Sequence, residues 1–179
     1  MYLRISELTE NIRHTPAMND FAKDHHNDWW FTTVGKGNKE RKIAVSPPIL
    51  NALKRWRAHL KLSPVLPLAN DTSPLLPKLR GSGGMSDTSH IRKIVQICFD
   101  EAIFHLRQKK LGNDAEELSQ ATVHWLRHTG ISDDVKIRPR EHVRDDASHS
   151  SGAITDKYID VEMRERHRSA KKKQIKSVD

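Results

Sequence analysis

A predicted β-hairpin in a chain otherwise patterned for helices is the feature that most limits the folds open to this sequence. Residues 29–34 are aromatic and β-branched, which is typical of a strand. A turn with two glycines follows at residues 35–39, and residues 41–45 predict the return strand. Apolar residues recur at helical spacing within residues 46–60 and 86–110. The sequence therefore predicts a mainly α protein with a small antiparallel β-hairpin, which is an α+β fold.

The first helix after the hairpin has a clear start. Ser46 is a favourable N-cap residue, and Pro47 suits the first helical turn. Four apolar residues then repeat at helical spacing and predict a face that packs on the core: Ile49, Leu53, Trp56 and Leu60. Arg55, Arg57 and Lys61 fall off this face, so we expect them to be exposed.

The longest helical pattern covers residues 86–110, with Ser86 or Asp87 as its N-cap. Six small or apolar residues share one face of this helix: Ile91, Ile94, Val95, Cys98, Ala102 and Leu106. Because Cys98 lies on this face, we expect it to be a buried packing thiol. Arg92 lies off the face, where a solvated position or a contact with a nucleic-acid backbone is expected.

Three other segments have weaker patterns. Residues 2–10 predict a short helix, and the polar residues 11–28 predict a solvated loop. The histidines within that loop do not have the spacing of a known metal site. Residues 61–84 are rich in Pro, Gly and Ser and predict a long loop, in which Leu75 and Leu76 are expected to form a short strand or a tether.

The charge balance indicates a polyanionic partner. The chain has 179 residues, enough for one domain, and its 31 Lys and Arg against 23 Asp and Glu give a net charge of +8. Nucleic acid is the first candidate and an anionic membrane surface the second, while an unspecialised basic protein stays open. No apolar stretch reaches the length of a membrane span, and the N-terminus lacks a signal peptide. The single Cys excludes an internal disulfide and fits a reducing cytoplasm.

The most informative short motif is His124-Trp125-Leu126-Arg127-His128. In a helix, His124, Arg127 and His128 lie at i, i+3 and i+4 and therefore share one face. A guanidinium and two imidazoles on one face suit a phosphate, because arginine offers a planar fork of donors and histidine transfers protons near neutral pH. The two histidines also have the spacing of a zinc pair, but Trp125 replaces the glutamate that a zinc protease needs.

Five short stretches, taken in order, resemble the catalytic domain of the tyrosine recombinases, the phage-integrase family. They are Arg4-Ile5-Ser6-Glu7-Leu8, Gly35-Lys36-Gly37-Asn38-Lys39-Glu40-Arg41, His124-x-x-Arg127, His149 with Tyr158 nine residues later, and Thr155-x-x-Tyr158. The resemblance implies the architecture of that domain and six catalytic residues: Arg4, Lys36, His124, Arg127, His149 and Tyr158. One departure is that the family usually has Leu-Gly-His where this chain has Asp146-Ala147-Ser148-His149, so the glycine of that turn is missing.

The resemblance also implies a mechanism. Tyr158 would attack the scissile phosphate and form a 3′-phosphotyrosyl link with a free 5′-hydroxyl. Arg4 and Arg127 would clamp the non-bridging oxygens, and His149 would hydrogen-bond the phosphate. His124 would assist removal of the proton from the tyrosine.

Further residues have supporting roles in this reading. Lys36 would protonate the leaving 5′-oxygen, and Glu7 would orient the first arginine. Lys39, Arg41 and His128 are expected to contact DNA, with Lys39 also the reserve candidate for the catalytic lysine. No metal and no other cofactor is expected.

The organisation expected from the resemblance has two parts. Residues 1–160 would form a catalytic domain that lacks its first helices and the separate core-binding domain, and residues 161–179 a basic C-terminal tail. The partner would be double-stranded DNA, with no membrane, bound by a homo-tetramer that is monomeric without DNA. The protein would be bacterial and cytoplasmic, and nucleoid-associated when bound.

The resemblance implies site-specific recombination by an integrase of a phage or genomic island. It leaves two alternative functions open. One is a catalytically inactive integrase fragment that binds DNA. The other is a type IB topoisomerase-like activity, in which the same tyrosine chemistry reseals the original strand. A histidine-rich metalloenzyme is the remaining alternative outside nucleic-acid chemistry.

Overall fold

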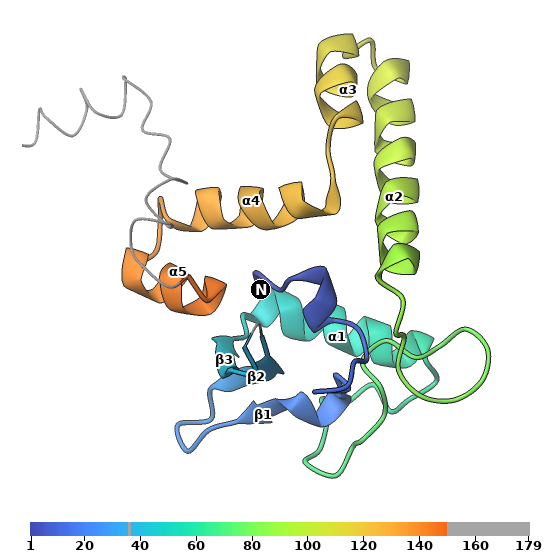
Figure 1. Cartoon of the computed structure of the whole chain (residues 1–179). Coiled ribbons are helices and arrows are strands. Elements are labelled where there is room, and N and C mark those ends of the chain that lie inside the picture. Colours follow the sequence, from blue (N-terminus) through green and yellow to red (C-terminus); the bar gives the residue numbers. More distant parts are fainter. Residues whose placement is uncertain (36, 150–179) are drawn as a thin grey trace, which may run out of the picture.

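The computed structural model describes residues 1–35 and 37–149, and all structural statements concern these residues. They form a small sheet followed by helices (Figure 1). The elements are the 3₁₀ turns η1 (Ile5–Glu7) and η2 (Met18–Asp20), strands β1 (Phe21–Lys23), β2 (Trp29–Val34) and β3 (Glu40–Ala44), and helices α1 (Pro47–His59), α2 (Thr88–Gln108), α3 (Gly112–Ser119), α4 (Val123–Asp134) and α5 (Arg140–Ala147). The predicted α+β fold with a small antiparallel sheet is confirmed.

The sheet is antiparallel, with the order β1-β2-β3. Phe31 at its centre pairs with Phe21 on one side and Ile43 on the other, and all three side chains are buried. The predicted hairpin is therefore confirmed to within one residue. The prediction of a solvated loop over residues 11–28 was wrong at β1, because a three-residue strand is too short to show an alternating pattern.

The main core lies between the sheet, α1 and the long loop that follows α1. Its buried members are Met18, Phe21, Phe31, Ile43, Val45, Leu53 and Leu75. The predicted apolar face of α1 is confirmed, since Ile49, Trp56 and Leu60 pack against this cluster around Leu53. Leu75 also acts as the expected tether, because its N–H donates to Pro16 O and its carbonyl accepts from Trp56 Nε1 at 2.7 Å.

Arg57 corrects the expectation that it is exposed. Its side chain is only 4% exposed, because the loop after α1 folds back over it. The Nε donates to the carbonyls of Ser63 and Val65, at 3.0 and 2.8 Å, and Nη1 pairs with Asp71 at 2.5 Å. Burial raises the pKa of Asp71, but the hydrogen bond from Arg57 and those from Ser73 outweigh burial and hold that pKa below its ordinary value. Arg57 is therefore a structural residue that orders the loop.

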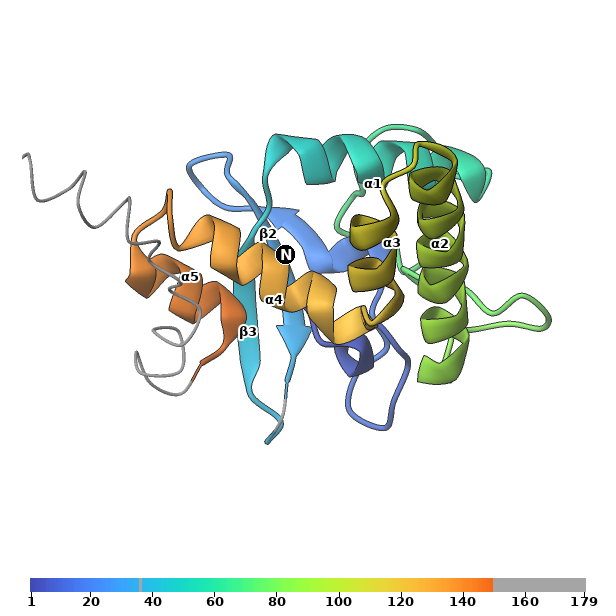
Figure 2. The ribbon, with the colours of Figure 1, turned by 90° about the horizontal axis from the view of Figure 1, so that it is seen from above.

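The helices that follow the loop form a pair, α2 and α3, which α4 connects to α5. Helices α2 and α3 lie side by side at one end of the molecule, and α4 runs from them back to α5, which lies beside β3 (Figures 1 and 2). A second, smaller core forms there from Tyr2, Ile131, Val143 and Ala147. This arrangement brings the N-terminal segment between α2, α4 and α5, although these elements are far apart in sequence.

Helix α2 differs from its predicted packing. Asp87 caps it as expected, accepting a hydrogen bond from Ser89 N at 2.8 Å. Ile91 and Ile103 are buried, but Ile94 is 47% exposed and Cys98 is exposed, so the prediction of a buried thiol was wrong. A periodic apolar face identifies what a helix is able to bury, and only its neighbours decide what is covered. Over the described residues, no helix is long and apolar enough to cross a membrane.

Candidate nucleic-acid interface

A cavity of about 550 Å³ lies where the N-terminal turn, α2 and α4 meet. Its walls come from three separated segments: Leu3, Arg4, Ile5, Ser6, Arg92, Gln96, Thr122, Val123, His124 and Arg127. Three guanidinium groups and one imidazole are among these residues, and none of them is a carboxylate. The lining therefore carries positive charge and no negative charge, which suits a phosphate-bearing ligand.

Arg4 is held at this cavity by Glu7. The backbone N–H of Arg4 donates to Glu7 Oε2 at 2.6 Å, and its Nη1 pairs with Oε1 at 3.2 Å. Glu7 is 3% exposed, whereas the Arg4 side chain is 39% exposed. These contacts tighten the chain into a 3₁₀ turn, so the predicted helix over residues 2–10 was wrong. The buried carboxylate of Glu7 therefore holds Arg4, whose side chain is partly exposed to solvent.

His124, Arg127 and His128 lie together in α4, as the spacing predicted. The rings of His124 and His128 meet edge to face, with centroids 4.5 Å apart. Arg127 is 8% exposed, and its Nη2 donates to the carbonyl of Ala147 at 2.5 Å. Within the described residues, no group of three His, Cys, Asp or Glu side chains is placed to hold a metal ion.

The turn that carries His149 keeps a left-handed conformation although the glycine is missing. Ser148 has φ 55° and ψ 45° at the end of α5. Ser148 N donates to Asp145 O and His149 N to Arg144 O, at 3.0 and 3.1 Å, which is the Schellman arrangement of a helix end. The turn geometry that the sequence left open is therefore the one that glycine favours, here adopted by serine.

Replacing Ser148 by glycine is expected to stabilise the fold by about 0.5–1 kcal/mol, because a side chain in the left-handed region costs about 1–2 kcal/mol. The measurement is the free energy of unfolding in urea. As a control of opposite sign, Ser132→Gly within α4 is expected to destabilise by about 0.5–1 kcal/mol. A loss of stability in Ser148→Gly would contradict the expected strain.

Two histidines of the site have lowered pKa values. Burial lowers the pKa of His149, and the positive charges of Arg127, Arg4 and Arg41 lower it further, as does His128. Burial also lowers the pKa of His128, with His124 and Arg127 adding to the effect. His149 is therefore neutral at pH 7 and lies within electrostatic reach of both candidate clamp arginines.

The lowered pKa of His149 predicts a pH-dependent contribution to stability. Since the folded pKa lies below the ordinary value near 6.5, the unfolded chain binds more protons between the two values, and stability is lost as the pH falls through this window. The difference in unfolding free energy between the wild type and His149→Gln is expected to narrow from pH 7.5 to pH 5.5. Urea unfolding at several pH values measures it, and a difference that widens at low pH would contradict the prediction.

Gly35, where strand β2 ends and the hairpin turn begins, lies close to Glu7 of the site. Gly35 is buried, its N–H donates to Lys39 O at 2.9 Å, and a Cβ at Gly35 would stand 3.2 Å from Glu7 Oε1. Lys39 is exposed, as its expected DNA contact requires. Arg41 instead turns inward, with a side chain 10% exposed that pairs with Glu7. The candidate catalytic residues Lys36 and Tyr158 lie outside the described residues.

The structure adds Gln96 to the site, and of the two roles open to Arg92 in the sequence it favours the contact with a nucleic-acid backbone. Both come from α2 and line the cavity beside Arg4 and Arg127. Arg92 is exposed and forms part of one wall of the candidate site. No motif marks this arginine in the sequence, and only the approach of α2 to the N-terminal turn reveals it.

Comparison with known proteins rests on structure. Neither a protein-family model nor a curated protein sequence matches this chain. Among solved structures, XerA recombinase is similar with a TM-score of 0.58 at 20% identity, over 96% of this chain and 53% of that one. XerH site-specific recombinase bound to its difH substrate, in a pre-cleavage complex, gives a TM-score of 0.52 at 19% identity, over 93% and 43%.

This is the fold of a tyrosine recombinase catalytic domain. The post-cleavage complex of XerH with a palindromic difH substrate agrees, with a TM-score of 0.54 at 19% identity over 93% of this chain and 42% of that one. The chain thus spans about half the length, or less, of these recombinases. The predicted tyrosine-recombinase architecture is confirmed at the level of the fold.

Proposed function

We propose that this protein is a tyrosine recombinase that breaks and rejoins DNA strands at a specific site, as an integrase of a phage or genomic island. One observation carries the proposal. Arg4 and Arg127, from segments more than a hundred residues apart, line one cavity with His124 and no carboxylate. This arrangement suits a phosphate that gains negative charge in a transition state.

In the proposed reaction, the Tyr158 oxygen attacks the scissile phosphorus, and the bond from phosphorus to the 5′-oxygen breaks. The tyrosine proton passes to His124, and Lys36 gives a proton to the leaving 5′-oxygen. The product is a 3′-phosphotyrosyl ester with a free 5′-hydroxyl, so the bond energy is stored for rejoining. Arg4, Arg127 and His149 stabilise the phosphate by position and charge, and no metal is required for this step.

The buried position of the other tyrosine supports Tyr158 as the nucleophile. The chain contains two tyrosines, and Tyr2 is only 5% exposed. The Tyr2 hydroxyl donates to the Asp134 carboxylate and accepts from Arg138 Nη1 at 3.2 Å. Burial raises the pKa of Tyr2, and Asp134 raises it further. Tyr2 is therefore engaged in packing, which leaves Tyr158 for phosphoryl transfer.

The proposal also covers the domain organisation, the partner and the assembly. Residues 1–160 act as the catalytic unit and residues 161–179 as a basic tail. The partner is double-stranded DNA in a bacterial cytoplasm, bound by four copies that are monomeric without DNA. Arg92, His128 and Lys39 supply further DNA contacts. Arg92 lines the cavity, the ring of His128 contacts that of His124, and Lys39 is exposed on the hairpin.

The experiment that tests this function traps the covalent intermediate. A DNA substrate is nicked close to the cleavage site, so that the fragment with the 5′-hydroxyl diffuses away after cleavage. Because the target is unknown, the substrates are a pool of sequences that flank the gene itself. A protein–DNA band that survives denaturing electrophoresis is expected. Salt-sensitive DNA binding without this band would favour the catalytically inactive DNA-binding alternative. Relaxation of supercoiled DNA without strand exchange would favour the topoisomerase-like alternative.

A further inference from the structure

Arg41 joins two parts of the site that are far apart in the sequence. Its Nη2 pairs with Glu7 Oε2 at 2.7 Å, across 34 residues. Its Nη1 donates to the backbone carbonyl of Asp146, across 105 residues. The Arg41 side chain is 10% exposed and that of Glu7 is 3% exposed. The guanidinium is thus a buried link between the hairpin, the N-terminal turn and the end of α5.

Two successive backbone carbonyls at the end of α5 each accept a hydrogen bond from an arginine. Arg41 binds the carbonyl of Asp146, and Arg127 Nη2 binds the next carbonyl, that of Ala147, at 2.5 Å. The last carbonyls of a helix lack partners within the helix and carry its negative end, so guanidinium groups satisfy them well. Both carbonyls immediately precede the left-handed turn that presents His149.

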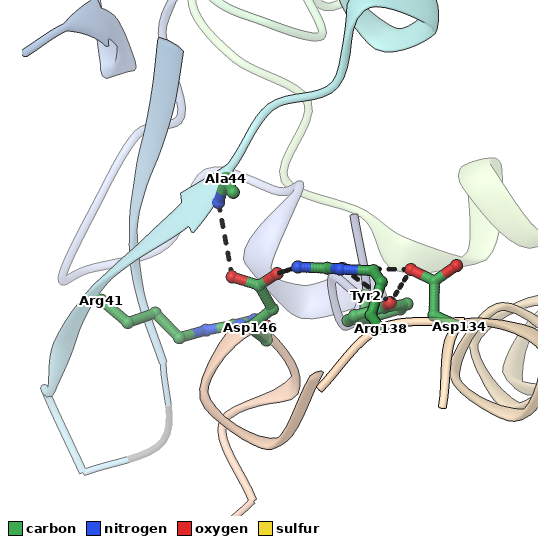
Figure 3. A network of polar contacts seen from close by, with 6 residues as sticks. All are labelled: Tyr2, Arg41, Ala44, Asp134, Arg138 and Asp146. Atoms are coloured by element: carbon green, nitrogen blue, oxygen red, sulfur yellow. Dashed lines mark hydrogen bonds and ion pairs between the residues drawn. The ribbon is translucent and has the colours of Figure 1, made fainter. Parts of the chain in front are cut away.

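The side chain of Asp146 fixes the same turn from the other side. Its Oδ2 pairs with Arg138 Nη2 at 2.6 Å, and its Oδ1 accepts from Ala44 N at 3.4 Å (Figure 3). Asp146 is 7% exposed. Figure 3 shows Arg41 approaching Asp146 from β3 while Arg138 reaches it from the side of Asp134 and Tyr2. The turn is therefore held to the sheet, to α4 and to the N-terminal segment.

These contacts form a continuous chain between the two arginines of the cavity. Glu7 Oε2 accepts both from the Arg4 backbone and from Arg41. Arg41 also binds the carbonyl of Asp146, which is followed in the chain by the Ala147 carbonyl that binds Arg127. We propose that Arg41 is a positioning residue that holds Arg4, Arg127 and His149 in one arrangement through Glu7 and the last turn of α5. This inference replaces the DNA contact expected for Arg41 from the sequence, and its activity test rests on the proposed function.

The geometry requires arginine rather than any cation. Two nitrogens of one rigid, planar fork reach two different acceptors, a carboxylate and a carbonyl. A lysine ammonium at this position is a single point charge on a flexible stem, so it reaches one acceptor and releases the other. A charge that only attracted DNA would be served by either residue.

Arg41→Lys is the variant that separates these roles. If Arg41 positions the site, single-turnover cleavage of the nicked substrate is expected to fall about 10²-fold, because small displacements of catalytic groups have effects of that size. The affinity for DNA is expected to stay within about twofold, since the charge is kept. Arg55→Lys, at an exposed position of α1, is the matched control and is expected to behave as the wild type.

A second readout does not depend on the proposed reaction. The pKa of the His149 imidazole, followed by NMR, is held down first by burial, and a loosened turn is expected to move it up towards the ordinary value in Arg41→Lys. If the wild type itself cleaves no DNA, the proposed function fails, and the His149 titration alone decides the positioning role. If Arg41→Lys does not fold, Glu7→Gln, which keeps the shape of the link and removes its charge, is tested on the same readouts.

The inference is overturned if Arg41→Lys cleaves at the wild-type rate with an unchanged His149 titration. It is equally overturned if cleavage falls only because DNA binding is lost, since that result assigns Arg41 to the DNA contact. A slower reaction at unchanged affinity, together with a shifted His149 titration, supports it.

Discussion

A Tyr158→Phe variant is expected to form no covalent complex with the nicked DNA substrate while binding that DNA as tightly as the wild type. The substitution removes one oxygen, the proposed nucleophile, and leaves the aromatic ring and every charge in place. No other group is expected to restore the bond, because the alternative tyrosine is buried and its hydroxyl is bonded to Asp134. The measurement is the fraction of labelled DNA that stays attached to protein on a denaturing gel.

The control uses the second tyrosine of the chain. Tyr2→Phe removes the same single oxygen from a buried ring and is expected to keep covalent trapping. Circular dichroism before each assay establishes that both variants are folded. A covalent band that persists in Tyr158→Phe and disappears in Tyr2→Phe would show that Tyr2, and not Tyr158, is the nucleophile. Loss of the band in both variants would show that the Tyr2 hydroxyl, through its bonds to Asp134 and Arg138, is also needed for cleavage.

Replacing Arg127 by alanine is expected to slow strand cleavage by about 10³-fold. Arg127 lines the cavity shared with Arg4 and His124, and donors fixed around a phosphate matter most where negative charge develops in the transition state. Single-turnover cleavage at saturating protein measures the step itself rather than binding. Arg127→Lys is expected to recover only part of the rate, because an ammonium lacks the planar fork of donors.

The same substitution has a structural consequence that must be separated from the chemical one. Arg127 Nη2 also holds the carbonyl of Ala147, and leaving that buried acceptor unpaired costs about 1–3 kcal/mol. Unfolding in urea therefore accompanies the kinetic assay, and rates are compared at temperatures where each variant is folded. Arg55→Ala, an exposed arginine on α1, controls for the loss of one positive charge. A folded Arg127→Ala that cleaves within about tenfold of the wild type would remove Arg127 from the proposed clamp.

Parts of the fold were predictable because they depend on short-range patterns. The hairpin strands β2 and β3 follow from β-branched residues and glycines that lie next to one another, and the start of α1 follows from the prolines of its first turn. The clustering of His124, Arg127 and His128 follows from helical spacing alone. In each case, the residues that decide the structure are neighbours in the chain.

Other parts were mispredicted because long-range contacts decide them. The periodic face of α2 predicted a buried Cys98, but α3 and α4 cover other positions and leave the thiol exposed. Arg57 has the sequence context of a surface residue, and only the returning loop with Asp71 buries it. Strand β1 forms because β2 offers an edge for pairing, which its three residues cannot signal alone.

The sequence by itself determined the hairpin, the helical face of His124 and Arg127, the basic character and the order of the motifs that resemble tyrosine recombinases. The tertiary structure alone decided that Arg4, Arg92 and Arg127 share one cavity and that Arg41 faces inward. The physical reason is the range of the forces involved. Periodicity and capping act within one or two helical turns, whereas the partners of a buried charge are chosen by segments that meet only in the folded chain.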